Sequence, residues 1–169
     1  MRAVENFPLA KRGVSATLIH AYGAVKLACI RTNHELGRWN DQTAAALENA
    51  CAELMNGSLD SSILVDALQG GAGTSTNMNV NEVIANRALL LLGKKPGDYD
   101  TLHPIDDVNL HQSTNDTYPT AMHIAAAEEL VKRLIPAVTK LRDTLQHKAT
   151  ALNDIIKIGY MPEERGLYK

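Results

Sequence analysis

Five side chains that hydrogen-bond readily stand in consecutive positions, Gln112-Ser113-Thr114-Asn115-Asp116. Pro119 follows and opens a long Ala-rich segment, so the pattern predicts a polar loop that leads into a helix. The free N–H groups of a first helical turn favour negative charge, and hydroxyl and amide donors suit a carboxylate better than a metal ion. The run therefore indicates a carboxylate site. A polar turn with an N-cap residue is the competing interpretation, and composition alone does not separate the two.

A second polar loop, Gly70-Gly71-Ala72-Gly73-Thr74-Ser75-Thr76-Asn77, runs into a helical pattern from Met78 to Leu92 that stops at Gly93. Its glycines allow the backbone to approach a ligand closely, and its hydroxyl and amide groups supply donors at the helix start. The loop is not a P-loop, because no Lys-Ser/Thr pair follows the glycines, and it is not the dinucleotide fingerprint G-x-G-x-x-G. Two polar loops that each open a helix favour a small ligand with a negative charge at both ends, which is a dicarboxylate.

Both loops lie in longer motifs that resemble one known family, the aspartase/fumarase superfamily. Residues 73–88 are similar to its GTSTNMNxNEVxANRA block, and residues 103–120 to its HPxDDVNxxQSTNDxYPT block. The resemblance extends roughly to Gly159 and implies an all-α, long-helix bundle that forms tetramers. Members eliminate ammonia, water or a related group from a dicarboxylic acid, often leaving fumarate. Thr114 favours an aspartate ammonia-lyase, which acts on L-aspartate, because fumarases more often carry Ser there.

The resemblance also implies roles for particular residues. The expected substrate-binding residues are Thr74, Ser75, Ser113, Thr114 and Asn115, whose donors would hold the carboxylates and stabilise an aci-carboxylate intermediate. The family places its base on a later loop, GSSxMPxKxN, which these 169 residues do not contain. We therefore expect an amino-terminal part of a lyase with no catalytic residue of its own and no activity alone. The alternatives are a class II fumarase-like fragment and a non-catalytic helical module for binding or oligomerisation.

A second, non-catalytic anion site of fumarases would match His103 and Asp106, although Ile105 departs from the Asn common there. The six histidines show no metal-ligand spacing, so we expect no metal and no cofactor. The expected partner is a small dicarboxylate, L-aspartate or fumarate.

Composition agrees with a soluble helical protein. Hydrophobic residues make up 45% of the chain and aromatic residues only 4%, which predicts an aliphatic core. The net charge of −2 gives no reason to expect nucleic-acid or membrane binding. Cys29 and Cys51 are too far apart for a C-x-x-C motif, and the sequence shows no signal peptide and no long apolar run, so we expect free thiols in the cytoplasm.

Apolar spacing of three and four residues predicts helices throughout, with at most a short strand pair near residues 98–108. One helix should span residues 14–36 and end near Gly37. The next should be capped by Asn40 or Asp41 and end at Asn56-Gly57. Residues 58–69 fit either a short helix or an extended approach to the glycine loop, and residues 94–98 form a turn.

The last predicted helix runs from Pro119 to about Ile156, with Pro136 expected to bend it or remove one backbone hydrogen bond. A narrow apolar seam follows it for about four heptads, which predicts packing against other helices, either in the part of the family fold that these residues lack or in another subunit of a homo-oligomer. Packing against two or three helices of this chain is the competing interpretation. The seam residues are Ile124, Ala127, Val131, Leu134, Val138, Leu141, Leu145, Leu152 and Ile155.

We divide the chain into a lyase-like region, residues 1–159, and an unrelated tail, residues 160–169. The tail is similar to a GYLPEERGLY stretch of some ATP-binding-cassette ATPases, but no Walker motif accompanies it.

Overall fold

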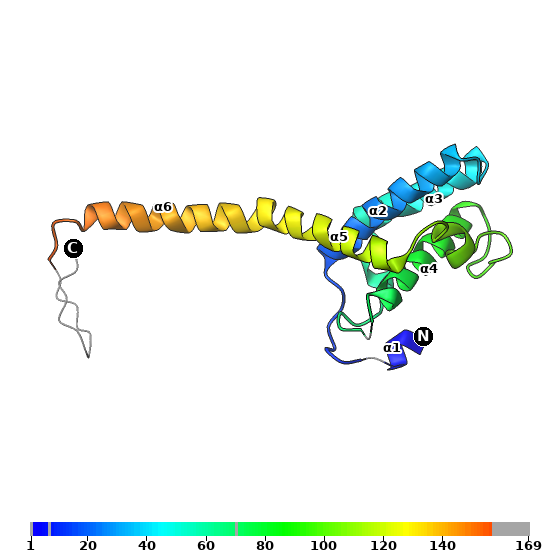
Figure 1. Cartoon of the computed structure of the whole chain (residues 1–169), viewed down its shortest axis with the longest axis horizontal. Helices are drawn as coiled ribbons and strands as arrows, with labels where there is room; N and C mark the ends of the chain where they lie inside the picture. The colour runs from blue at the N-terminus through cyan, green and yellow to red at the C-terminus, as the bar shows by residue number, and fades with distance from the viewer. Residues whose placement is uncertain (1, 7, 70, 157–169) are drawn as a thin grey trace. The chain divides into compact units, whose positions relative to one another are not determined.

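The computed structural model describes residues 2–6, 8–69 and 71–156, and these form an almost wholly helical protein (Figure 1). The chain divides into two compact units, residues 1–127 and residues 128–169. Within the described residues the only β-type pairing is one isolated antiparallel bridge between Gly13 and Asp66, so the all-α prediction is confirmed. Residues 98–108 form turns and a π-helical segment, not a strand pair. No described helix is long and apolar enough to cross a membrane. The elements are α1 (Arg2–Asn6), α2 (Ala16–Glu35), α3 (Asp41–Met55), η1 (Asp60–Ser62), α4 (Thr74–Leu91), η2 (Pro104–Val108), α5 (Thr114–Glu129), η3 (Leu130–Leu134) and α6 (Ile135–Ala151).

The first two long helices begin and end where the sequence predicts. Helix α2 ends before Gly37, whose φ of 81° is the left-handed conformation in which glycine is least strained. Helix α3 is capped by Asn40, whose side-chain oxygen accepts a hydrogen bond from the Thr43 N–H at 2.8 Å. Asn56 and Gly57 end it. Local signals were sufficient here because every capping partner lies within a few residues of the helix end.

The ambiguous segment between α3 and the glycine loop adopts both of the expected conformations in turn. It forms the single 3₁₀ turn η1 and then runs extended, where Asp66 bridges to Gly13. The Asp66 carboxylate accepts hydrogen bonds from the backbone N–H groups of Lys11 (2.7 Å) and Leu68 (2.8 Å). These hydrogen bonds lower the pKa of Asp66.

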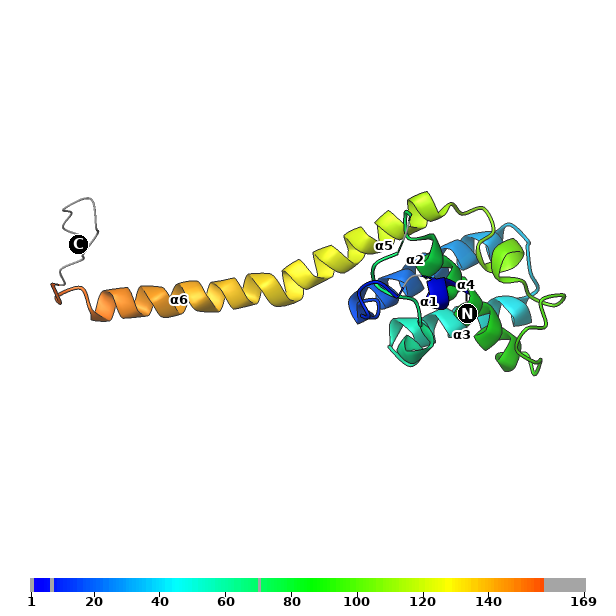
Figure 2. The same ribbon diagram turned by 90° about the horizontal axis from the view of Figure 1, so that it is seen from below.

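The core of residues 1–127 is aliphatic, as predicted, and lies where α2, α3 and α4 pack side by side (Figures 1 and 2). Helices α2 and α3 approach closely at Gly23, because a Cβ there would lie 2.7 Å from Met55 Cγ and 3.1 Å from the Cys51 carbonyl oxygen. The large, fully buried apolar side chains are Tyr22, Ile30, Leu47, Leu54, Val80, Ile84, Leu89, Leu102 and Val108. Each such side chain contributes about 1.5–3 kcal/mol when it leaves water, so this cluster holds the three helices together.

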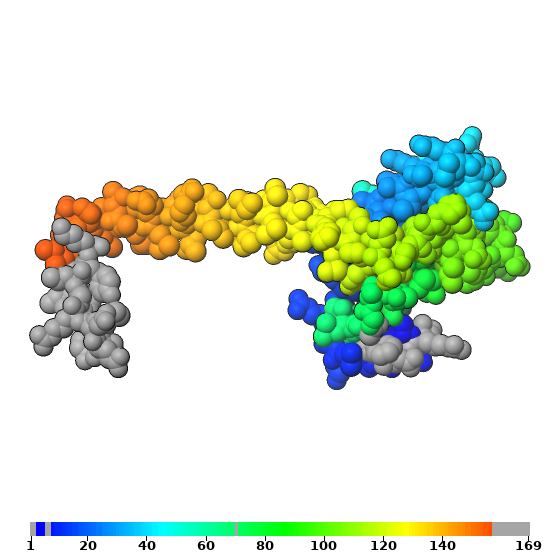
Figure 3. Space-filling view, in the orientation of Figure 1, coloured from blue at the N-terminus to red at the C-terminus, as the bar shows by residue number. Residues whose placement is uncertain are grey.

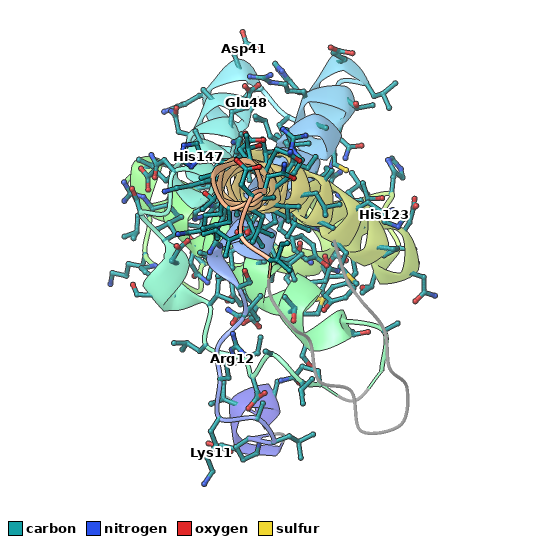
Figure 4. All side chains as sticks on the ribbon, turned by 90° about the vertical axis from the view of Figure 1, so that its left-hand side faces the viewer. Lys11, Arg12, Asp41, Glu48, His123 and His147 are labelled. Carbon is teal, nitrogen blue, oxygen red and sulfur yellow. The ribbon has the colours of Figure 1, made fainter. Side chains whose placement is uncertain are left out.

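Charged residues lie at the outer edge of the α2–α3 pair. Glu48 of α3, labelled in Figure 4 together with Asp41, accepts a hydrogen bond from the Arg31 side chain of α2 at 3.0 Å. Asp41 Oδ1 lies 3.1 Å from Nε2 of His34, which follows Arg31 by about one turn at the same end of α2. Lys11 and Arg12 lie apart from these pairs, on the segment before α2 (Figure 4). Exposed ion pairs of this kind contribute little, so the apolar contacts decide how the two helices pack.

Helices α4 and α5 both begin earlier than predicted. Helix α4 starts at Thr74 rather than Met78, so the hydroxyl-rich part of the glycine loop is its first turn, with Gly73 as the N-cap at a φ of 82°. Helix α5 starts at Thr114 and contains Pro119, so the prediction that Pro119 opens the helix is wrong. A proline inside a helix leaves the carbonyl four residues earlier without its donor. That residue is Asn115, which is exposed, so water can hydrate its carbonyl group.

Residues 128–156 continue as the π-helical turn η3 and helix α6. The Ile135 N–H donates to the Leu130 carbonyl, five residues back, immediately before Pro136 at the start of α6. This wider turn accommodates the missing N–H of the proline, which agrees with the predicted loss of one backbone hydrogen bond. Helix α6 ends at Ala151, short of the predicted Ile156.

The apolar seam of this unit is uncovered. Val131 is 65% exposed, Leu141 59% and Leu145 58%. Within residues 128–156 these side chains have no apolar partner that covers them, and packing of the seam against other helices remains a prediction.

Candidate functional site

The two polar motifs lie side by side in the structure. The side-chain amide of Asn77, in the first turn of α4, donates a hydrogen bond to Thr114 Oγ1, the first residue of α5, at 2.9 Å. Gly73 packs directly against the Tyr118 ring, so closely that a Cβ at residue 73 would overlap the ring atoms. Two helix N-termini that are 40 residues apart in sequence therefore meet, as a two-loop carboxylate site requires.

The five predicted binding residues do not all share one cavity. A cleft of about 540 Å³ beside the first turn of α4 is lined by Thr74, Ser75 and Glu82, with apolar neighbours from α1 and from residues 64 and 65. Thr114 and Asn115 begin α5, Ser113 directly precedes it, and none of the three lines this cleft. Ser113 and Asn115 are exposed and Thr114 is half-buried. The structure thus connects Thr114 to α4 through Asn77.

The start of α5 also behaves as an ordinary capped helix. Ser113 Oγ accepts the Asn115 N–H at 3.2 Å, and the Ser113 carbonyl accepts from Asp116 and Thr117 at 3.1 and 3.0 Å. The two interpretations of the QSTND run are therefore compatible, because a cap residue and an anion site both use the first helical turn. The space-filling view shows residues 104–120, from green to yellow-green, as one continuous surface (Figure 3).

A network of amide side chains, not predicted from the sequence, lies beneath this surface. Asn109 Oδ1 accepts hydrogen bonds from the side-chain amides of Asn77 (3.0 Å) and Asn81 (3.1 Å), and both donors are fully buried. Asn77 and Asn81 stand one turn apart on α4, so they face the same side of the helix. This spacing was visible in the sequence, but the acceptor lies far along the chain and carries no periodic signal.

The same oxygen of Asn109 accepts a hydrogen bond from Lys26 Nζ at 3.2 Å, and Gln112 Oε1 accepts one at 2.7 Å. Lys26 has no exposed surface, and its burial lowers its pKa to about 8 because an ammonium is costly to remove from water. Lys26 was not among the residues predicted from the sequence. Its one signal is a lysine flanked by Val25 and Leu27 in an otherwise apolar stretch of α2.

The two residues of the expected second anion site share one turn. His103 Nδ1 accepts the N–H groups of Ile105 and Asp106, each at 3.2 Å, and so caps η2. Because Nδ1 acts as an acceptor, the proton of the neutral imidazole ring is assigned to Nε2. The Asp106 carboxylate is 76% exposed.

The neighbouring Asp107 has the stronger structural role. Its carboxylate accepts hydrogen bonds from Arg38 Nη2 (3.0 Å), Trp39 Nε1 (3.2 Å) and the His103 N–H (2.8 Å). These contacts fasten η2 to the segment that follows α2.

In the part of the chain that the structure describes, no three His, Cys, Asp or Glu side chains gather as a metal site. Cys29 and Cys51 are free thiols there, and burial raises the pKa of both, that of Cys51 to about 12. These thiols are therefore poor nucleophiles near neutral pH.

Comparison with known proteins identifies the family. Residues 1–161 match the protein family described as Lyase. A class II fumarate hydratase of Mycobacterium tuberculosis is 48% identical over 158 residues, which cover 94% of this chain and 32% of that protein. One of Chromobacterium violaceum is 44% identical over 158 residues, or 94% of this chain and 34% of that protein.

Solved structures agree with the sequence comparison. The fumarate lyase:delta crystallin structure from Brucella melitensis superimposes with a TM-score of 0.90 at 42% identity, covering 98% of this chain and 39% of that one. A class II fumarase from Schistosoma mansoni gives a TM-score of 0.84 at 34% identity, covering 95% of this chain and 34% of that one. The chain spans about a third of the length of the curated relatives it matches. It belongs to the fumarate lyase family, the aspartase/fumarase superfamily.

Proposed function

We propose that this chain supplies the dicarboxylate-binding part of a fumarate hydratase-type active site. The observation that carries the proposal is the junction of the starts of α4 and α5, where Asn77 donates to Thr114 and Gly73 packs on Tyr118. Two helix N-termini direct free N–H groups and positive dipole ends toward the same region. Neutral donors that would hold the carboxylates come from both helix starts: Thr74 and Ser75 on α4, and Ser113, Thr114 and Asn115 at α5.

The substrate proposed is fumarate or L-malate rather than L-aspartate. The similar curated relatives are named as class II fumarate hydratases, which supports the fumarase alternative better than the ammonia-lyase interpretation. That interpretation depended on Thr114 alone. Ser and Thr present the same hydroxyl group to a carboxylate, so this one residue carries little information about the leaving group.

The proposed chemistry is addition of water to a carbon–carbon double bond and its reversal. Removal of the proton next to one carboxylate places extra negative charge on that carboxylate, and donors aimed at it lower the energy of the intermediate. The residues of this chain would orient the dicarboxylate and stabilise that charge. Proton removal needs a base, which the family resemblance places on the GSSxMPxKxN loop, and the 169 residues contain no such loop. The chain alone is expected to bind without turnover.

We also propose that the chain forms a homo-oligomer through the seam of residues 128–156. Val131, Leu134, Val138, Leu141 and Leu145 are all more than half exposed. Burying one such side chain contributes about 1.5–3 kcal/mol, so five together exceed the lower estimates of the entropy cost of association. His103 and Asp106 are retained as a proposed second anion site, supported by their position on one exposed turn.

Calorimetric titration of the full chain with fumarate, L-malate and L-aspartate tests the dicarboxylate proposal. Fumarate and L-malate should bind more tightly than L-aspartate. The neutral analogue fumaramide should not bind, because the helix N-termini recognise charge. Thr114→Ala should weaken fumarate binding about tenfold. The matched control is Thr144→Ala on α6, which should leave binding unchanged. Equal binding by Thr114→Ala and the unmodified chain, or tighter binding of L-aspartate, would contradict the proposal.

A further inference from the structure

Lys26 is a buried cation, and among the residues that the structure describes no acidic side chain lies within hydrogen-bonding distance of it. Its recorded acceptors are two neutral amide oxygens, Asn109 Oδ1 at 3.2 Å and Gln112 Oε1 at 2.7 Å. The thiols of Cys29 and Cys51 are the charged or titratable groups that interact with it most. Burial of an ammonium costs free energy unless hydrogen bonds or an opposite charge compensate for the lost hydration. The position of Lys26 therefore requires a structural explanation.

The acceptors of Lys26 belong to the segment that carries the carboxylate site. Gln112 Oε1 accepts the hydrogen bond from Lys26, and the Gln112 amide nitrogen donates to the backbone carbonyls of Val108 (2.8 Å) and Leu110 (3.2 Å). The Asn109 amide nitrogen in turn donates to the Gln112 carbonyl at 3.1 Å. Lys26 therefore orients both amides, and they close the 108–112 turn around it.

The same hydrogen bonds extend to the start of α5. Asn109 Oδ1, polarised by the ammonium, also accepts from Asn77, and the Asn77 amide donates its other hydrogen bond to Thr114 Oγ1 at 2.9 Å. An oxygen that receives several donors can satisfy them only in one orientation. The chain Lys26–Asn109–Asn77–Thr114 thus links a buried residue of α2 to a hydroxyl group at the proposed site.

We propose that Lys26 is a positioning residue, whose ammonium sets the conformation of residues 109–114 and so the orientation of the Thr114 hydroxyl toward a carboxylate. The effect on carboxylate binding rests on the proposed dicarboxylate function, whereas the effect on the conformation of residues 109–114 does not. Lys26 touches no ligand in this role. Its positive charge also adds to the positive ends of α4 and α5, which favours a dianion at their junction.

A role in packing predicts a different mutational order from a role in positioning. Lys26→Met keeps the length of the side chain and removes the charge and the donors, whereas Lys26→Arg keeps both but adds volume. If Lys26 only fills space, Lys26→Met should disturb the 108–112 turn less than Lys26→Arg does. If Lys26 positions the turn, Lys26→Arg should disturb the turn less, even where it lowers the melting temperature more than Lys26→Met.

Hydrogen exchange of the full 169-residue chain, followed by mass spectrometry without ligand, tests the structural part. In Lys26→Met, amides of residues 108–117 should exchange about tenfold faster, because the Gln112 and Leu110 N–H bonds open more often. Lys26→Arg should exchange closer to the unmodified chain, and residues 41–55 of α3 should stay protected in both. The matched control Ile30→Met, also fully buried on α2, should leave residues 108–117 unchanged.

Adding fumarate separates the two proposals. If fumarate protects residues 113–117 of the unmodified chain, Lys26→Met should lose this protection unless fumarate is raised about tenfold. If fumarate protects nothing, the dicarboxylate proposal fails for this chain, and the ligand-free exchange still decides the role of Lys26. Unchanged exchange of residues 108–117 in a folded Lys26→Met, or a greater effect of Arg than of Met on those residues, overturns the inference. If Lys26→Met does not fold, Gln112→Ala replaces it as the test and should speed the exchange of residues 108–117. Unchanged exchange of these residues in Gln112→Ala would also overturn the inference.

Discussion

The side-chain amide of Asn77 donates a hydrogen bond to Thr114 Oγ1 at 2.9 Å and joins the first turns of α4 and α5. Asn77 is fully buried, whereas Thr114 is half-buried and lies beside the exposed residues Ser113 and Asn115. One contact therefore couples the core to the surface at which a ligand would bind.

Asn77→Ala should destabilise the chain by about 1–3 kcal/mol, because it removes the hydrogen bonds that this fully buried amide donates to Asn109 Oδ1 and Thr114 Oγ1. Urea unfolding followed by circular dichroism measures this loss. The control Asn49→Ala lies exposed on α3 and should change the unfolding free energy by less than about 0.5 kcal/mol. Equal stability of the two variants would show that the network is not needed for folding.

Gly73→Ala should be much more destabilising than Gly93→Ala. Both glycines have a positive φ, 82° and 72°, so both substitutions cost about 1–2 kcal/mol of backbone strain. Only at Gly73 would the new Cβ overlap the Tyr118 ring, whereas no atom lies within 4 Å of it at Gly93. Overpacking should add about 1–3 kcal/mol at Gly73. Comparison of the two melting temperatures is the measurement, and similar values would contradict the close packing.

Stability should rise between pH 8 and pH 9 because of Lys26. Its pKa falls from 10.5 when unfolded to about 8 when folded, so the unfolded chain binds more protons in this window. Unfolding then becomes less favourable as the pH increases, by about 1 kcal/mol over one pH unit. The window stops at pH 9 because burial raises the pKa of Cys29 and Cys51, which reverses the dependence at higher pH.

The measurement for this pH effect is the difference in unfolding free energy between the unmodified chain and Lys26→Met at both pH values. Taking the difference removes the contribution of the other titratable groups, because both proteins contain them. If it stays constant from pH 8 to pH 9, Lys26 does not titrate there.

Val138→Asp should reduce self-association in sedimentation experiments, because it places a charge in the middle of the exposed seam of α6. His147→Asp is the matched control: at about 100° per residue it faces the opposite side of the same helix, and it adds the same negative charge. A chain that sediments as a monomer before any substitution would contradict association through this seam.

Local signals in the sequence were sufficient for the helical class, the boundaries of α2 and α3, and the two polar motifs. Gly37, Asn40 and Gly57 act on backbone atoms a few residues away, so their effects can be predicted without a fold. Motif order also led to the family. It did not distinguish hydratase from ammonia-lyase, since one hydroxyl residue, Thr114, carried that interpretation.

Only the tertiary structure decided where α4 and α5 begin, because cap residues such as Ser113 compete with the proline that follows them. It also decided which polar residues are buried. Lys26 and Asn109 are 83 residues apart, and Asn77 and Thr114 are 37 residues apart. Hydrogen bonds across such separations leave no periodicity in the sequence. They form because apolar packing of α2, α3 and α4 brings these groups together away from water, where each donor must find an acceptor.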